Sequence, residues 1–135
     1  MEKSKTYDLE NRLVDFAASI VLFTNTINKS YAGVHLSNQI TRSGTSPALN
    51  YGEAQAAESR KDFIHKMNIC LKELRETKIC LQIIAKTHLS NNNDFLDKNT
   101  KEASELIAIF TKSISTAKKK QTPNLPIIIL SLFGI

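Results

Sequence analysis

The chain has 135 residues, of which 41% are hydrophobic and 23% charged, with four glycines, three prolines and no tryptophan. This composition favours one globular domain built from long regular elements over a loop-rich or disordered chain. The formal net charge of +5 lies mostly in the tails, because residues 8–117 carry 13 Lys and Arg against 12 Asp and Glu, and such a nearly neutral body argues against a fold that clamps a polyanion.

The first predicted element is a helix over residues 8–27. Its apolar residues recur at alternating spacings of four and three, which places them on one helical face. They are Leu9, Leu13, Phe16, Ile20, Phe23 and Ile27. Asp8 is suited to cap the N-terminus of this helix. Residues 28–33 are rich in turn formers and predict a short connection that sends the chain back antiparallel.

A second helix is predicted over residues 34–57, and its inward face differs from an ordinary apolar stripe. The positions on this face begin apolar and become small or polar along the chain. They are Leu36, Ile40, Ser43, Pro47, Asn50, Ala54 and Ala57. Because Pro47 lacks a backbone donor, we expect a bend near Ser43 and Gly44, with Ser46 placed to assist the freed carbonyl groups. Polar packing is therefore predicted on this face.

Two further helices are predicted over residues 60–88 and 94–117. Ser59 and Asp62 have the spacing of a capping box, and the polar residues 90–94 separate the two helices and cap the second. One helix presents Phe63, Met67, Cys70, Leu74, Leu81 and Ile84 on a single face, and the other presents Leu96, Ala103, Ile107, Phe110, Ile114 and Ala117. The sequence therefore predicts an all-α protein that folds as an antiparallel up-down-up-down four-helix bundle.

Tails flank the predicted bundle at residues 1–7 and 118–135, and the second tail is basic and then apolar. Its apolar part is shorter than the roughly 20 residues that span a bilayer, so we expect no membrane contact. Such a tail either docks on its own bundle or a neighbouring subunit, or is a late extension of the chain, and we favour the extension. No charged leader followed by an apolar stretch opens the chain, which predicts a cytoplasmic protein. Cys70 and Cys80, ten residues apart on one helix, are predicted to be reduced thiols of the core.

Polar residues on the second and third predicted helices are spaced so that they can meet. If these helices are antiparallel neighbours, Arg42 pairs with Glu73 or Glu76, and Asn50 bridges backbone groups near Pro47. The predicted polar network comprises Arg42, Ser43, Ser46, Asn50, Glu53, Asp62, Glu73 and Glu76. The alternative is that the charges of the third helix form a solvated face.

The motifs of catalytic and metal sites are missing from this pattern. Asp62 and His65 come nearest to the Glu-x-x-His pairs of di-iron bundles, whereas His35 and His88 fall near predicted helix ends. The serines and cysteines have no evident partner base, and the glycines do not cluster in a phosphate-binding loop. We therefore expect no catalytic residue, metal ligand, cofactor or small-molecule substrate, and a protein that is not an enzyme.

Three segments in the middle of the chain have distinctive sequences. They are Gln-Ile-Thr-Arg-Ser-Gly-Thr-Ser-Pro-Ala-Leu-Asn-Tyr-Gly-Glu over residues 39–53, Ser-Arg-Lys-Asp-Phe-Ile-His-Lys-Met over 59–67, and Leu-Lys-Glu-Leu-Arg-Glu-Thr over 71–77. From about Tyr7 to Ala117 the chain resembles the bacterial four-helix-bundle family of proteins encoded in intervening sequences of large-subunit ribosomal RNA genes. The polar pattern of that family falls on the residues of the predicted network and on Phe63. Pro47 and Gly52 stand where many relatives carry helix formers.

The resemblance implies a cytosolic homo-oligomer, a ring of five bundles, without established enzyme activity. The chain is also similar to the accessory protein of diversity-generating retroelements, a bundle ring that binds nucleic acid and a reverse transcriptase. Our first hypothesis is therefore an oligomeric scaffold or adaptor, and the second is a protein that binds RNA or DNA through basic side chains. The candidate nucleic-acid contacts are Arg60, Lys61, Lys66, Lys72, Arg75, Lys78, Lys118, Lys119 and Lys120.

Overall fold

Four α-helices make up most of the protein. The computed structural model describes residues 8–120, and the regular structure of this part of the chain is helical, without a strand. The helices are α1 (Leu9–Phe23), α2 (Tyr31–Gln55), α3 (Arg60–Thr87) and α4 (Asn93–Lys120), and a short 3-10 helix, η2 (Thr24–Thr26), follows α1. The all-α class predicted from the sequence is confirmed. Residues 1–7 and the apolar part of the predicted C-terminal tail lie outside the described residues.

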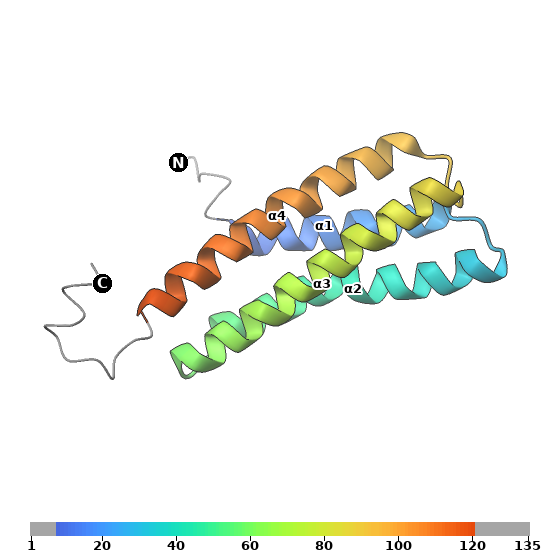
Figure 1. Ribbon diagram of the computed structural model, residues 1–135. Coiled ribbons are helices and arrows are strands. Elements are labelled where there is room, and N and C mark those ends of the chain that lie inside the picture. The colour runs from blue at the N-terminus through green and yellow to red at the C-terminus, as the bar shows by residue number, and fades with distance from the viewer. Residues whose placement is uncertain (1–7, 121–135) are drawn as a thin grey trace, which may run out of the picture.

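The helices lie side by side as long rods (Figure 1). The connections that follow α1 and α3 lie at one end of the rods, and the connection between α2 and α3 lies at the other. The most extensive packing is between α2 and α3, followed by α3 with α4 and α1 with α2, whereas α1 and α4 meet only slightly. Packing therefore follows chain order, and the side between α1 and α4 is the most open.

The core is formed by the apolar stripes that the sequence predicts. The six stripe residues from Leu9 to Ile27 are buried, as are most of those on α3 and α4. Two stripe residues differ, since Phe63 and Ile107 are only partly covered and pack on the edge of the core. Their neighbours Ile64 and Leu106 are buried, so the inward face of each helix is wider than the predicted stripe.

Capping residues explain where the helices begin. Asp8 accepts a hydrogen bond from the Asn11 backbone N–H at 3.4 Å, and Ser59 Oγ accepts one from the Asp62 N–H at 3.0 Å. Ser30 caps α2 by accepting from the Gly33 N–H at 3.2 Å, so α2 begins three residues before the predicted start. Gly33 is required there, because a Cβ atom at this position would lie 1.6 Å from a backbone oxygen of the preceding turn.

The far ends of α1 and α4 also differ from prediction. The first helix is followed by η2 and an extended Ile27, so its last predicted turn is not α-helical although Ile27 remains buried. In contrast, Lys118, Lys119 and Lys120 form the last turn of α4 and do not belong to a tail. Lysine is a good helix former, and cations are favoured near the negative end of a helix dipole, which accounts for this extension.

Candidate functional site

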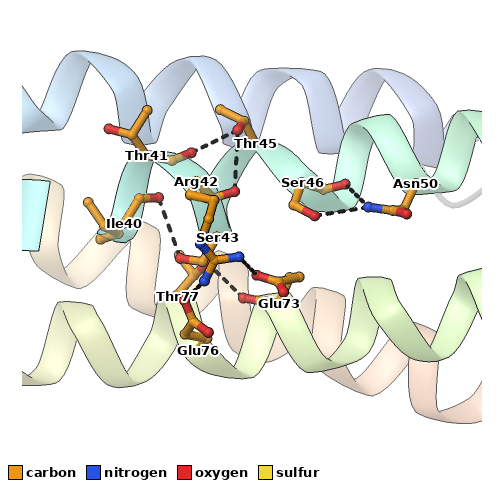
Figure 2. A network of polar contacts seen from close by, with 10 residues as sticks. All are labelled: Ile40, Thr41, Arg42, Ser43, Thr45, Ser46, Asn50, Glu73, Glu76 and Thr77. Atoms are coloured by element: carbon orange, nitrogen blue, oxygen red, sulfur yellow. Dashed lines mark hydrogen bonds and ion pairs between the residues drawn. The ribbon is translucent and has the colours of Figure 1, made fainter. Parts of the chain in front are cut away.

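Arg42 of α2 is held by two carboxylates of α3 (Figure 2). Its Nη1 donates to Glu73 Oε2 at 2.9 Å, and its Nη2 pairs with Glu76. Because Glu73 and Glu76 are three residues apart, their side chains share one helical face and a single planar guanidinium can reach both. The structure thus brings together the three charged residues whose pairing the spacing predicts, and it engages both glutamates at once.

These ion pairs lie at the border between the protein and solvent. The side chain of Glu73 is only 10% exposed, whereas that of Arg42 is 52% exposed. The negative charge of Glu73 is the main cause that raises the pKa of Arg42, with burial opposing it. Solvent screens a pair that is open on one side, so we interpret Arg42 mainly as the counter-charge that makes a largely buried Glu73 tolerable.

Two hydroxyl groups link α2 to α3 beneath the ion pairs. Thr77 Oγ1 lies 2.9 Å from Ser43 Oγ and 2.8 Å from the Glu73 carbonyl oxygen, and both hydroxyl side chains are fully buried. Small side chains that satisfy each other allow close approach of two helices without leaving a buried polar atom unpaired. The sequence pattern does not single out Thr77, although it is a polar residue placed between Leu74 and Leu81 in the buried stripe.

The other residues of the predicted network form separate contacts. Asn50 Nδ2 donates to the carbonyl oxygen and the hydroxyl of Ser46 at 3.0 and 2.9 Å, within one turn of α2. Glu53 pairs with Lys66 of α3 at 3.1 Å. Asp62 is exposed in the first turn of α3. A single network is therefore the wrong description, because Asp62 precedes Glu73 by eleven residues, or about 16 Å along a helix.

Pro47 is buried inside α2 and does not end it. Its carbonyl oxygen accepts a hydrogen bond from Cys70 Sγ of α3 at 3.4 Å. Burial raises the pKa of Cys70 to about 12, and it also raises the pKa of Cys80. Both cysteines are free thiols in the core, as the sequence predicts. A thiol held protonated by its surroundings is a poor nucleophile.

The basic residues do not form one continuous surface. On α3, Lys61, Lys72 and Arg75 fall on one face by helical periodicity, whereas Lys66 turns towards α2 to reach Glu53. Arg60 instead lines a groove of about 540 Å³ between the start of α3 and the end of α4. The other groove residues include Phe63, Ile109, Lys112, Ala117 and Lys120. Of the predicted cations, this groove brings Arg60 and Lys120 together.

A polar seam between α1 and α4 is absent from the sequence-based prediction. Arg12 donates to both carboxylate oxygens of Glu102 at 2.8 and 2.7 Å and to Glu105 at 3.1 Å, and its hydrogen bonding to Glu102 is the main cause that raises the pKa of Arg12. Further along, Ser19 Oγ donates to Asn99 Oδ1 at 2.8 Å. The only available signal was Asn99 itself, a polar residue between Leu96 and Ala103 in an apolar stripe.

Residues 8–120 contain neither a cluster of metal ligands nor a helix that could span a membrane. Within this stretch, no group of three or more His, Cys, Asp or Glu side chains is arranged to hold a metal ion. His35, His65 and His88 are exposed, and His88 closes α3 with a positive φ of 55°. None of the described helices is long and apolar enough to cross a membrane.

Sequence and structure comparisons place this bundle among known proteins. The sequence profile of the 23S rRNA-intervening sequence proteins matches residues 5–112. The chain belongs to that family. It is also similar to a solved protein of unknown function from the S23 ribosomal protein family of Bacteroides thetaiotaomicron, with 31% identity and a TM-score of 0.72 over 78% of this chain and 97% of the other. Among curated proteins, none matches the chain.

Proposed function

We propose that this family member is a non-enzymatic scaffold or adaptor that assembles into a ring of identical subunits in the cytoplasm. Each subunit would be an antiparallel up-down-up-down bundle, which the alternating ends of the helix connections support (Figure 1). The resemblance to bundle rings suggests five subunits. The polar contacts between α2 and α3 serve in this proposal to hold the subunit together, and no residue is assigned a catalytic role.

Large apolar side chains are exposed on α1, α2 and α3, and the observation that carries the proposal is the two groups on α1 and α3. Val14, Val21 and Leu22 are exposed on α1 and face away from its buried stripe. Ile79 and Ile83 are exposed one turn apart on α3. These helices make no substantial contact with each other, because α2 and α4 are the main neighbours of α3. We call the two sets the α1 surface and the α3 surface.

Two different apolar surfaces on one subunit suit head-to-tail association. If the α1 surface of one copy packs on the α3 surface of the next, every subunit uses both surfaces and the chain of contacts can close into a ring. Exposed valine, leucine and isoleucine side chains that gather on a helix are common at protein interfaces, since association removes them from water. A face-to-face dimer would instead need only one of the two surfaces.

Charge substitutions on each surface test this arrangement. We expect the wild-type chain to elute as an oligomer in light-scattering chromatography, and Val21→Lys and Ile79→Lys each to elute as monomers. An equimolar mixture of the two variants should form a dimer, because one intact α1 surface still meets one intact α3 surface. Thr111→Lys, at an exposed site on α4, is the matched control and should leave the oligomer intact. A monomeric wild-type chain at micromolar concentration would contradict the proposal.

A second candidate function is the binding of single-stranded nucleic acid, favoured by the groove that Arg60 lines. Its lining includes the cations Arg60, Lys112 and Lys120 together with one aromatic ring, Phe63, and such surfaces suit phosphates and unstacked bases. Binding of a labelled single-stranded RNA should weaken steeply with salt and weaken further in Lys112→Glu. The control is Lys29→Glu, in the connection before α2. An equal loss of RNA affinity in both variants would show that binding depends only on the overall positive charge and not on this groove.

A further inference from the structure

The open side of the bundle, between α1 and α4, contains a groove that the proposed assembly does not use. The groove has a volume of about 380 Å³ and is lined by Asp15, Phe16 and Ser19 of α1 and by a run of residues on α4 that includes Lys98, Asn99 and Lys101. Binding sites for small molecules span roughly 300 to 1,000 Å³, so the groove has room for a ligand of the size of one or two amino acids. We call it the α1–α4 groove.

Asn99 gives this groove an unusual chemical feature. Asn99 is buried, with only 2% of its surface exposed, and its Oδ1 accepts a hydrogen bond from Ser19 Oγ at 2.8 Å. Its Nδ2 is buried without a hydrogen-bond partner among residues 8–120. A buried amide donor that stays unpaired opposes folding, and buried polar groups are almost always satisfied by protein, water or ligand. Asn99 is also one of the residues that line the groove, so a small rotation of its side chain would present this buried donor to an oxygen atom from outside the described chain.

Charge changes along the groove in one direction. Along α4, Lys98 and Lys101 stand within two residues of Asn99, and Glu102 and Glu105 follow them. Towards the start of α1 the groove meets a second hollow of about 500 Å³, which shares Asp15, Glu102 and Glu105 with it. The second hollow is lined by Asp8, Asn11, Arg12, Asp15, Glu102 and Glu105.

The acidic end keeps an excess of negative charge. Four carboxylates line the second hollow against one guanidinium, and Arg12 is already shared between Glu102 and Glu105. Asp15 is exposed, and among residues 8–120 the carboxylate of Asp8 has only the side-chain amide and the backbone N–H of Asn11 in hydrogen-bonding range. A cation placed here would find carboxylates that no basic side chain of this seam neutralises.

We propose that the α1–α4 groove binds a short zwitterionic ligand, a carboxylate with a basic group a few bonds away, as in the C-terminus of a basic peptide. The ligand carboxylate accepts from Asn99 Nδ2 between Lys98 and Lys101, and its cationic side chain lies over Asp15 towards the acidic end. A nucleic-acid phosphate is disfavoured because the carboxylates would repel it. An uncharged ligand would pair neither with Lys98 and Lys101 nor with the carboxylates of the acidic end.

Calorimetric titration of the full chain with the tripeptide Arg-Arg-Ala tests this proposal. We expect saturable binding, weakened by about tenfold or more when the C-terminal carboxylate is amidated, and none for Glu-Glu-Ala. Free L-arginine separates two sources of the same chemistry: affinity equal to that of the tripeptide assigns the site to a free amino acid, and weaker affinity assigns it to a peptide C-terminus. Absence of saturable binding for both Arg-Arg-Ala and arginine at millimolar concentration would overturn the proposal.

Substitutions in the groove show whether the binding occurs there. Asn99→Leu keeps the size of the side chain and removes the unpaired donor, so the protein should stay folded while affinity for Arg-Arg-Ala falls by about tenfold or more. Asp15→Asn should weaken the same titration and lower its sensitivity to salt. Asp97→Asn, exposed on α4 and outside the groove lining, is the matched control and should bind like wild type. A folded Asn99→Leu variant with unchanged affinity would place the ligand elsewhere and refute the assignment.

Discussion

Gly44 on α2 should be indispensable for the approach of α2 to α1. A Cβ atom at this position would lie 2.7 Å from Cγ2 of Ile20 and 3.1 Å from its Cβ and Cγ1. Carbon atoms normally approach to about 3.5 to 4.0 Å. Ile20 is fully buried and branched at Cβ, so it has neither space nor an alternative rotamer with which to withdraw. The methyl group of an alanine would therefore force the two helices apart.

Two opposing effects set the magnitude for Gly44→Ala. Overpacking of a filled core costs about 1 to 3 kcal/mol, whereas replacing glycine by alanine within a helix returns about 1 kcal/mol. The two effects leave a net fall of about 0 to 2 kcal/mol in the free energy of unfolding, and because Ile20 has no space to withdraw we expect a value in the upper half of that range. Gly52→Ala is the matched control on the same helix, because a Cβ atom there has no neighbour within 4 Å. It should raise the free energy of unfolding by about 0.5 to 1 kcal/mol.

Urea unfolding followed by circular dichroism measures both effects, with protein concentration held constant because any oligomer links stability to concentration. The same Gly44→Ala change in an Ile20→Ala background should no longer destabilise, since the atoms that it strikes are gone. If Gly44→Ala stabilised the wild-type chain as much as Gly52→Ala does, α2 and α1 could not be packed as closely as described, and the reasoning would fail.

Two further predictions concern the α2–α3 seam. Arg42→Ala should lower the free energy of unfolding by about 1 to 2 kcal/mol in the same urea assay, because Glu73 loses its counter-charge; this value lies between those of exposed and buried ion pairs. The control Arg75→Ala, at an exposed site on α3, should change the free energy of unfolding by less than about 0.5 kcal/mol. Equal effects of the two substitutions would contradict the proposed role of Arg42 as the counter-charge of Glu73. Burial raises the pKa of Cys70 to about 12, so the folded state keeps a proton that the unfolded thiol loses above its ordinary value near 9. Stability contributed by Cys70 is therefore complete below about pH 9 and declines as pH rises towards 12, and Cys70→Ala should show a shallower decline than wild type across this range in pH-dependent unfolding.

The helices could be predicted from the sequence because their apolar residues follow one period. From Leu9 to Ile27 the spacing of three and four is unbroken, and burial of each residue removes apolar surface from water. The helix ends were less predictable. The start of α2 depends on Ser30 and Gly33 acting together in a turn, and the end of α4 depends on lysines that the charge pattern alone assigns equally well to a tail.

Contacts of the candidate site could be predicted only where the spacing of residues along a single helix places them on one face. The i, i+3 spacing of Glu73 and Glu76 places two carboxylates on one face, so an arginine on the neighbouring helix has an evident partner. The contact of Arg12 with Glu102 needs the register of α1 against α4, which the spacing along either helix does not contain. Asn99 is a different case, because a single polar residue in a stripe predicts a buried amide without identifying its partner.

The contact between α2 and α3 is suited to stabilise the fold, whereas the contact between α1 and α4 is suited to bind a ligand. Between α2 and α3, the small side chains of Ser43 and Thr77 allow close packing, and the buried hydroxyl of Thr77 finds its partner within the chain. Between α1 and α4 the contact is slight, the charges face a groove, and Asn99 keeps a donor that no described residue uses. A subunit that needed only to fold would gain stability from an apolar residue in place of Asn99. The polar seam therefore makes sense as a surface kept for an external ligand, at a cost that the tightly packed α2–α3 seam allows the fold to bear.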